Sequence, residues 1–269
     1  VDWNLAIFSF ILINLLMIFE IADKLTARDE LEVARDVQIS LIPVQAPDDS
    51  DFEISCYYET AKEVGGDFFD FIKKPDNTYL ISIGDISGKG MSAALQMVQI
   101  RLIFRFISDT ISNPKNILVS INKSIFKLIK KGLYFSMSLA EVKDKNMKIC
   151  RAGHTPALYY NSIERTCTEI NQRGMALGLT ESELFDNSLE EIEINSNSDD
   201  LIMFYSDGLT EAMNSNKNEY GIDRLKNLIL ANTSENAESI KNSILNEIAA
   251  FRGYAEVHDD ITFIIMKAK

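Results

Sequence analysis

The sequence is poor in the residues that bind zinc or form disulfides, with three cysteines and two histidines among 269 residues. Cys56, Cys150 and Cys167 are odd in number and widely separated, without the close pairs that metal sites use. This scarcity argues against a cysteine-bound metal and against a disulfide framework. It predicts buried thiols in a protein of a reducing compartment.

A cysteine nucleophile is also poorly supported. Cys167 and Arg173 are separated by five residues, as in the phosphate-binding loop of cysteine-dependent phosphatases. Such a loop needs glycine so that its backbone amides can surround a phosphate. The five residues here contain no glycine and include Glu169, whose carboxylate repels phosphate. We therefore assign Cys167 no nucleophilic role.

Positive charge is scarce as well, because 27 Lys and Arg stand against 40 Asp and Glu, giving a net charge of −13. Binding to a nucleic-acid backbone depends on Lys and Arg that neutralise phosphates, so this balance disfavours a nucleic-acid partner. The acidic excess predicts a solvated surface. With 269 residues, 46% of them hydrophobic, the chain can form one domain with a substantial core plus an appendage.

The first segment differs from the rest of the chain. Leu5–Phe19 is an apolar run of fifteen residues, shorter than the roughly 20 residues that a membrane-spanning helix needs. Trp3 before the run, and Lys24 and Arg28 after it, suit an anchor with a positive cytoplasmic flank. Three interpretations stay open: the end of a transmembrane helix with membrane contact through residues 1–21, a dimerising helix, or the last helix of a sensor domain.

The next segment, Ala22–Leu41, places leucine and valine among charged residues and predicts an exposed amphipathic helix that Pro43 ends. Such a helix can pair with its copy in a homodimer. We therefore divide the chain into an N-terminal apolar and linker segment, residues 1–43, and a folded domain, residues 44–269.

From residue 52 onward the pattern is that of a mixed α and β domain. Strand pairs joined by short turns, with helices grouped in runs, favour an α+β sandwich of antiparallel sheets over alternating βαβ units. The predicted strands are Phe52–Tyr58, Tyr79–Ile83, Tyr134–Val142, Met147–Arg151, Ala157–Tyr160, Thr166–Ile170, Leu189–Ile194, Leu201–Tyr205 and Ile261–Met266. The predicted helices are Met91–Ile107, Pro114–Lys131, Ile222–Leu230 and Glu235–Phe251.

Four short acidic motifs carry the strongest functional signal. They are GGDFFD at Gly65–Asp70, GDISGKG at Gly84–Gly90, SDG at Ser206–Gly208 and DDIT at Asp259–Thr262. Strands that end together bring such carboxylates to one point, and glycine allows the backbone a close approach. Mg²⁺ and Mn²⁺ prefer these oxygen ligands. A single Asp–Gly pair is a common turn, but the four motifs together predict metal-assisted hydrolysis.

Each carboxylate can be given a role in that chemistry. Two ions about 3.5–4 Å apart share a water, lower its pKa towards 7 and direct the resulting hydroxide at phosphorus. Asp85 is placed to bridge two ions, and the carbonyl of Ile86 supplies a further oxygen. Asp70 is expected to support Asp67 by a hydrogen bond or to cap its turn. The other expected ligands and supporting residues are Asp207, Asp259 or Asp260, Gly66, Gly84 and Gly208.

In their order, these motifs resemble the SpoIIE-type, RsbU-like branch of the metal-dependent serine/threonine phosphatases, the bacterial relatives of protein phosphatase 2C. The resemblance runs from about Glu30 to the C-terminus. Its motifs are LEVARDVQISLIP, VGGDFFD, IGDISGKGMSAAL, FSMSLAEV, AGHTPAL, ALGL, LIMFYSDGLTEAMN, YGIDRL and DDITFIIM. It implies a four-layer α-β-β-α sandwich of two antiparallel sheets flanked by helices.

The resemblance also implies the metal-binding residues and the cofactors. It implies two or three Mn²⁺ or Mg²⁺ ions, and it favours Asp259 over Asp260 as the last direct ligand, with Asp260 in support. The implied ligand set is Asp67, Asp85, the Ile86 carbonyl, Asp207 and Asp259.

The family further implies a phosphorylated protein substrate, an anti-sigma-factor antagonist in a partner-switching circuit. The catalytic domain would be cytoplasmic, with residues 1–21 as a possible anchor at the inner face of the cell membrane. The helix ahead of the domain would relay a signal, often by forming a homodimer. We hypothesise a two-state control in which Ala22–Leu41 sets whether Asp67 and Asp85 hold both ions.

Some residues and functions stay open. His154, in AGHTPAL, is expected to be structural or substrate-facing, with a general acid as the alternative, and His258 to be a surface or outer contact. No arginine matches the phosphate-binding one of the eukaryotic enzymes, which leaves Lys62 and Lys89 as weak candidates. The alternatives are a pseudophosphatase scaffold and a hydrolase of small phosphoesters, since partner choice lies in loops such as Thr180–Ser188.

Overall fold

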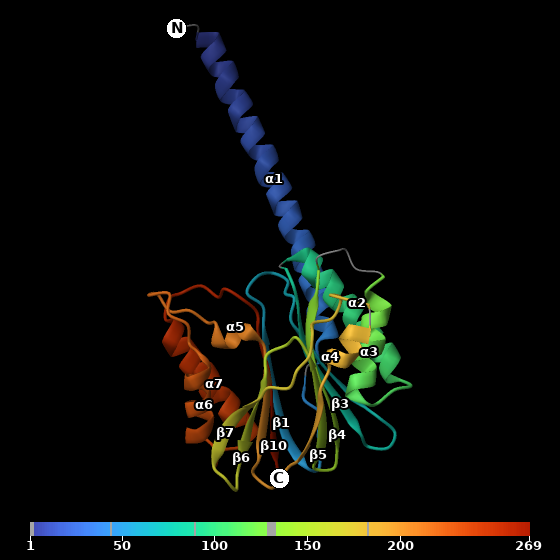
Figure 1. Cartoon of the computed structure of the whole chain (residues 1–269). Helices are drawn as coiled ribbons and strands as arrows, with labels where there is room; N and C mark the ends of the chain where they lie inside the picture. The colour runs from blue at the N-terminus through green and yellow to red at the C-terminus, as the bar shows by residue number, and fades with distance from the viewer. Residues whose placement is uncertain (1–2, 44, 89, 128–132, 182) are drawn as a thin grey trace.

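Two antiparallel sheets of five strands each pack face to face in the computed structural model (Figure 1). The structure describes residues 3–43, 45–88, 90–127, 133–181 and 183–269. The first sheet has the order β1 (Phe52–Glu59), β10 (Ile261–Ala268), β9 (Leu201–Tyr205), β6 (Ala157–Asn161) and β7 (Thr166–Ile170). The second has the order β2 (Phe68–Lys73), β3 (Tyr79–Ile86), β4 (Phe135–Lys143), β5 (Asn146–Ala152) and β8 (Glu191–Asn195).

Helices cover the outer face of each sheet, which confirms the four-layer α-β-β-α sandwich. α6 (Ile222–Ala231) and α7 (Ala237–Arg252) pack on the first sheet. α2 (Met91–Ser108) and α3 (Pro114–Ile125) pack on the second. Asn113 and Asn236 cap α3 and α7, each accepting the backbone N–H three residues on, at 2.9 and 2.8 Å.

In the first sheet, β9 and β10 are buried on both faces, and successive side chains of each strand enter different cores. On β9, Phe204 belongs to the core between the sheets, whereas Met203 belongs to the core under α6 and α7. On β10 the same division separates Ile264 from Phe263 and Ile265. Because side chains alternate along a strand, a continuous apolar run such as Leu201–Tyr205 fits a strand covered on both sides.

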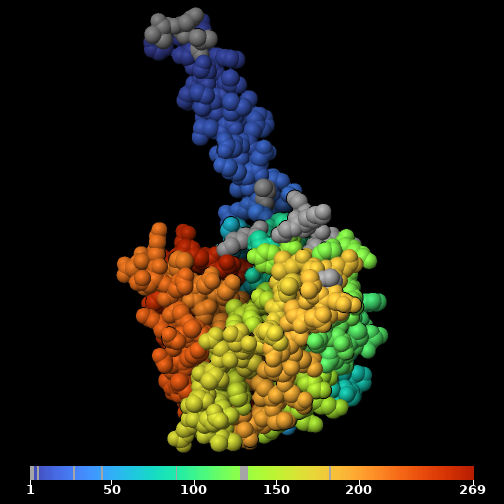
Figure 2. Space-filling view, viewed as in Figure 1, coloured from blue at the N-terminus to red at the C-terminus, as the bar shows by residue number. Residues whose placement is uncertain are grey.

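α1 (Trp3–Leu41) is one continuous helix of 39 residues, about 58 Å long at the usual rise. It therefore joins two segments that the sequence predicted separately. Its described side chains up to residue 30 are exposed, and the helix stands away from the body, which it reaches at its C-terminal end (Figures 1 and 2). Within the described residues, one stretch of this helix, Ala6–Leu41, is long and apolar enough to cross a membrane.

Several predicted boundaries needed correction. β2 was not predicted, because its sequence was interpreted as a metal-binding loop. β3 continues to Ile86, so Asp85 lies inside the strand. The strand predicted at Leu189–Ile194 starts at Glu191, and the short helices α4 (Glu183–Ser188) and α5 (Asp207–Thr210) were missed. The helix predicted over 114–131 ends at residue 125, and positions 128–131 lie outside the described residues.

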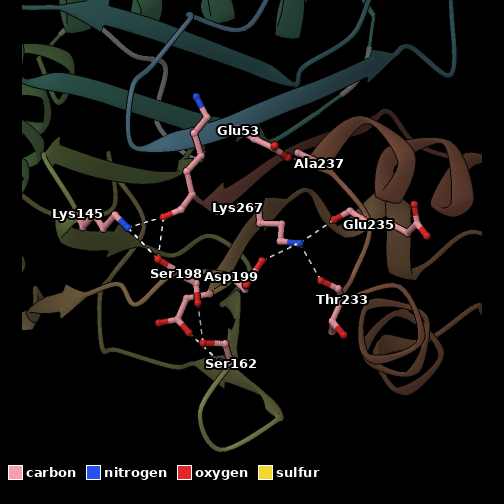
Figure 3. A network of polar contacts seen from close by, with 11 residues as sticks. Glu53, Lys145, Ser162, Ser198, Asp199, Thr233, Glu235, Ala237 and Lys267 are labelled. Carbon is pink, nitrogen blue, oxygen red and sulfur yellow. Dashed lines mark hydrogen bonds and ion pairs between the residues drawn. The ribbon is translucent and has the colours of Figure 1, made fainter.

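A polar network fixes the end of β10 at the edge of the sandwich opposite α1 (Figures 1 and 3). The buried amine of Lys267 donates to the carbonyls of Thr233 and Glu235 at 2.8 and 2.9 Å, and it pairs with Asp199 at 3.2 Å. These bonds tie the last strand to the connection between α6 and α7. We interpret this network as structural, because the acidic motifs lie at the other end of the strands.

Candidate active site

The four acidic motifs meet at one end of the sandwich, and each sheet contributes two of them. In the second sheet Asp67 directly precedes β2 and Asp85 lies near the end of β3, with Phe68 paired opposite Gly84. In the first sheet Asp207 follows β9 and Asp259 precedes β10, with Tyr205 paired opposite Phe263. Antiparallel pairing places the end of one strand beside the start of its neighbour, which brings these motifs together.

Asp67 and Asp85 lie in an electrostatically unfavourable setting for carboxylates. Asp67 is 2% exposed, and burial and the neighbouring charges of Asp85 and Asp260 raise its pKa well above the usual value. Burial and the carboxylates of Asp207, Asp259 and Asp260 raise the pKa of Asp85 to about 7. Like charges this close cost free energy unless a cation offsets them.

This donor set fits hard divalent cations in chemistry and charge. One oxygen of Asp67, Oδ2, is buried and has no hydrogen-bond partner within the part of the chain that the structure describes. A buried carboxylate oxygen without a partner is costly, and Mg²⁺ or Mn²⁺ is its natural partner among carboxylates. Among the described residues, however, no three carboxylate, histidine or cysteine side chains already stand close enough to hold one ion.

Glycine lets the backbone of this end pack closely. A Cβ on Gly66 would lie 2.9 Å from the Ile86 carbonyl oxygen and 3.1 Å from an oxygen of Asp85. The carbonyl predicted as a ligand therefore faces the loop that carries Asp67. A Cβ on Gly208 would lie 2.1 Å from the carbonyl oxygen of Asp260, and one on Gly84 would lie 2.6 Å from the carbonyl oxygen of Ser136 on β4. The three glycines predicted in support are all positions of close approach.

Asp260 holds the loop of Asp67 in place. Its Oδ1 accepts the N–H of Ala61 at 2.8 Å, and its Oδ2 accepts the N–H of Gly66 at 2.7 Å. Asp259 is half-buried and lines the pocket in front of that loop, and its Oδ1 accepts the N–H of Asp260 at 3.1 Å. Both residues between which the sequence left a choice line this pocket, and Asp260 in addition accepts the backbone N–H groups of Ala61 and Gly66.

Asp70 differs from its prediction. Its carboxylate, fully buried, does not bond to Asp67 but pairs with two arginines of α2. Arg105 donates from Nε and Nη2 at 2.6 Å each, and Nε of Arg101 lies 3.1 Å from Oδ2. The prediction of a hydrogen bond to Asp67 was therefore wrong, because β2 turns Asp70 towards the helix layer. Asp70 joins β2 to α2, the helix that follows the loop after Asp85.

A cleft of about 350 Å³ opens beside these carboxylates. Asp85 and Asp207 are its two acidic residues, and the other lining side chains are neutral: Ser87, Tyr134, Ser136, His154 and Thr155. Sequence analysis singled out His154 but missed Ser136 and Thr155, whose signals were the motifs FSMSLAEV and AGHTPAL. Gln38, buried on α1 and bonded to Gly65, was missed as well.

The positions of the two histidines and of Lys62 bear on the roles considered for them. His154 is 4% exposed, its Nδ1 lies 2.8 Å from the hydroxyl of Ser136, and burial and the charge of Arg151 lower its pKa to about 3. It is therefore neutral near pH 7, which disfavours the general-acid alternative. His258 is exposed. Lys62 is exposed and lines the pocket with Asp259, and Lys89 lies outside the described residues.

The cysteines are all free thiols. Cys150 is buried, and burial raises the pKa of Cys167 to about 11. A thiol with so high a pKa is a poor nucleophile, in agreement with the sequence analysis.

Comparison with known proteins gives a consistent result. The family described as stage II sporulation protein E (SpoIIE) matches residues 75–269. Phosphoserine phosphatase RsbU of Bacillus subtilis is 27% identical over 247 residues, which cover 90% of this chain and 71% of that protein. Phosphoserine phosphatase RsbP of the same organism is 23% identical, over 91% of this chain and 59% of its own length.

The fold is that of solved phosphatase domains. The SiaA-PP2C domain of Pseudomonas aeruginosa has a TM-score of 0.79 at 17% identity, over 91% of this chain and 98% of that domain. The PP2C phosphatase domain of SpoIIE from Bacillus subtilis has a TM-score of 0.67 at 17% identity, over 81% of this chain and 62% of that one.

Proposed function

We infer the function of this chain from its family, since it belongs to the stage II sporulation protein E (SpoIIE) family. Its relatives RsbU and RsbP are named phosphoserine phosphatases, and the chain is accordingly a serine/threonine phosphatase. We propose in addition that it uses two or three Mn²⁺ or Mg²⁺ ions and a water nucleophile. The observation that carries this proposal is the meeting of the four acidic motifs at Asp85, where burial and the charges of Asp207, Asp259 and Asp260 raise the pKa of Asp85 to about 7.

In the proposed mechanism the ligands are Asp67, Asp85, Asp207, Asp259 and the carbonyl of Ile86. Divalent ions bound there would supply an acidified water and would offset the charge of the phosphoryl oxygens. The other residues of the site position these ligands. Asp260 fixes the Asp67 loop through the N–H groups of Ala61 and Gly66. Neutral side chains line the cleft beside Asp85 and Asp207, so they add no positive charge that would compete with the ions.

The proposed substrate is a phosphorylated protein, an anti-sigma-factor antagonist in a partner-switching pathway. Support comes from the similarity to RsbU and RsbP, whose names state phosphoserine phosphatase. A protein substrate also suits a site at one end of the sandwich, where the ends of strands from both sheets meet. We further propose that residues 44–269 form the cytoplasmic catalytic domain, and that residues 1–43 carry the input signal, with a homodimer formed through α1.

The test is Mn²⁺-dependent release of phosphate from a phosphoserine protein by the full chain. Asp207→Asn is expected to lower turnover by at least about 100-fold, since it removes charge that holds the ions. Asp144→Asn is the matched control. It makes the same change in an exposed turn far from the site, where a positive φ of 53° suits asparagine.

The outcomes separate the alternatives. Release from free phosphoserine as fast as from the phosphoprotein would indicate a hydrolase of small phosphoesters. Mn²⁺ binding without turnover on either substrate would indicate a scaffold without activity. Turnover that Asp207→Asn leaves unchanged would show that the site lies elsewhere.

A further inference from the structure

His154 and Thr155 lie in the loop that crosses from the second sheet to the first, between β5 and β6. Nδ1 of His154 lies 2.8 Å from the hydroxyl of Ser136 on β4, in the second sheet. The hydroxyl of Thr155 donates to the carbonyl oxygen of Tyr205, the last residue of β9 in the first sheet. Two neighbouring side chains of one loop thus hold the two sheets at the end where the acidic motifs meet.

Both attachment points lie next to a carboxylate of the candidate site. Ser136 is the register partner of Asp85, and its hydroxyl lies 3.5 Å from the carbonyl oxygen of Asp85. Tyr205 is separated from Asp207 by one residue, so the bonded carbonyl lies at the start of the turn that presents Asp207. All of these groups except Tyr205 line the same cleft. The loop therefore spans from the strand of Asp85 to the strand of Asp207.

The loop is itself firmly held. Nη1 of Arg151 donates to the carbonyl oxygen of His154 at 2.6 Å, and Nε of Arg151 donates to the carbonyl oxygen of Gln172 at 3.1 Å. Gly153 has a φ of 71°, and a Cβ there would lie 2.6 Å from that of Ala176. A side chain could not be added at this point without moving the backbone. His154 and Thr155 consequently project from a rigid support.

We propose that His154 and Thr155 are positioning residues that set the separation of Asp85 and Asp207, and so the affinity of the site for divalent ions. The two carboxylates come from different sheets, so their separation depends on how the sheets are held relative to each other at this end. Hydrogen bonds from one loop to both strands limit that motion. The inference rests on the proposed function for its ions, and it assigns neither residue a contact with substrate.

The experiment compares two substitutions at one position in the full chain. Thr155→Val keeps the shape of the side chain and removes the hydroxyl, whereas Thr155→Ser keeps the hydroxyl that reaches Tyr205. Mn²⁺ affinity is measured by calorimetry, and phosphate release is measured as a function of Mn²⁺ concentration. Thr155→Val is expected to weaken Mn²⁺ binding by about 10-fold or more, with turnover largely restored at saturating Mn²⁺. Thr155→Ser is expected to bind Mn²⁺ within about 3-fold of the parent.

Two further variants keep the test decisive. Ser136→Ala removes the attachment on the other sheet and is expected to weaken Mn²⁺ binding in the same direction. Thr168→Val makes the valine change at an exposed position of β7 and is expected to leave Mn²⁺ affinity as in the parent. Circular dichroism and the thermal midpoint verify that each variant is folded. If Thr155→Val does not fold, Ser136→Ala carries the test.

The results bear separately on the two proposals. Equal Mn²⁺ affinity in the parent, Thr155→Val and Ser136→Ala would overturn the positioning role, whatever the activity. A parent that binds Mn²⁺ without releasing phosphate would refute the proposed reaction and leave the positioning role to be decided by the binding data. A parent that binds no Mn²⁺ would overturn both, since no ion would remain to be positioned.

Discussion

Gln38 and Gly65 exchange two hydrogen bonds, although 27 positions separate them in the chain. Nε2 of Gln38 donates to the Gly65 carbonyl oxygen at 2.6 Å, and Oε1 accepts the Gly65 N–H at 3.1 Å. Gln38 is 2% exposed and lies in the last turns of α1, whereas Gly65 opens the loop that carries Asp67. The N-terminal helix is thereby tied to a candidate metal ligand.

Replacing Gln38 is expected to affect both stability and metal binding. Gln38→Leu leaves the N–H and the carbonyl of Gly65 buried without partners, which lowers the free energy of unfolding by about 1–3 kcal/mol. It also frees the Asp67 loop, so Mn²⁺ binding weakens. Urea unfolding and calorimetry measure the two effects. Ser40→Ala is the control, because its exposed hydroxyl bonds to the carbonyl of Val37 in its own helix.

The same contact gives the two-state hypothesis a physical path from α1 to the site. Mn²⁺ binding by Gln38→Leu that matched the parent would remove that path. The hypothesis also requires that deletion of residues 1–43 change the activity or the oligomeric state. A truncated chain that retained both would rule it out.

Replacement by asparagine is expected to affect stability at Asp260 and Mn²⁺ affinity at Asp259. In Asp260→Asn one of the two acceptor oxygens becomes an NH₂ group that faces a backbone N–H, which costs about 1–3 kcal/mol of stability. Asp259→Asn keeps the oxygen that accepts the N–H of Asp260, so without metal its stability is expected within about 0.5 kcal/mol of the parent. Its Mn²⁺ affinity is expected to fall. Equal losses of stability would contradict this division of roles.

Much of the fold could be predicted because most of its strands have a recognisable local sequence pattern. Leu201–Tyr205 and Ile261–Met266 are apolar runs of strand length, and α3 and α7 form from segments with apolar residues at helical spacing. β2 was missed because its first residues belong to GGDFFD, which was interpreted as a metal-binding loop. Its Asp70 is a charged residue inside a buried strand, where the two arginines of α2 pair with it.

The carboxylates of the candidate site were predicted from the sequence, but the residues that position them were not. The acidic motifs are recognisable because each joins Asp to Gly or to a second Asp at a strand end. Gln38, Ser136 and Thr155 act through contacts between segments distant in the sequence, and a single glutamine, serine or threonine carries no local sign of such a contact. Their partners depend on the register of β3 with β4 and on the end point of α1.

Breaking the buried ion pairs of Asp70 should lower the free energy of unfolding more than breaking an exposed ion pair. Asp70→Ala leaves Arg101, whose side chain is 10% exposed, without its counter-charge, at a cost of about 3–5 kcal/mol. Arg105→Gln should cost less, about 1 kcal/mol, because that side chain is 44% exposed and Arg101 remains. Urea unfolding of both variants measures the difference. The reverse order would contradict the division of roles between Arg101 and Arg105.

The exposed apolar half of α1 is expected to bind lipid. Removing residues 1–21 should abolish flotation of the chain with phospholipid vesicles. Ile11→Glu combined with Leu15→Glu should do the same, since a charged residue at the centre of a membrane helix costs about 2.5–3.5 kcal/mol. Leu25→Glu, in the charged half of the helix, is the control and should still float. A full chain that stayed in solution as a stable dimer would instead support the dimerising interpretation.

The buried His154 should make the protein less stable as the pH falls. Burial and the charge of Arg151 lower its pKa from 6.5 to about 3 in the folded chain. The unfolded chain therefore takes up a proton below pH 6.5 that the folded chain does not take up until about pH 3, and stability is lost across that interval. Between pH 7 and 5 this single group should lower the free energy of unfolding by about 2 kcal/mol.

Urea unfolding at several pH values measures how the free energy of unfolding changes with pH in the parent and in His154→Asn. EDTA is added so that bound metal does not contribute to stability. Asparagine keeps a polar group near Ser136 but does not titrate. The free energy of unfolding of His154→Asn should therefore fall less steeply as the pH is lowered, by the slope that one proton contributes. Parallel curves would show that His154 is protonated equally in both states and that it is not the buried neutral side chain that links the two sheets.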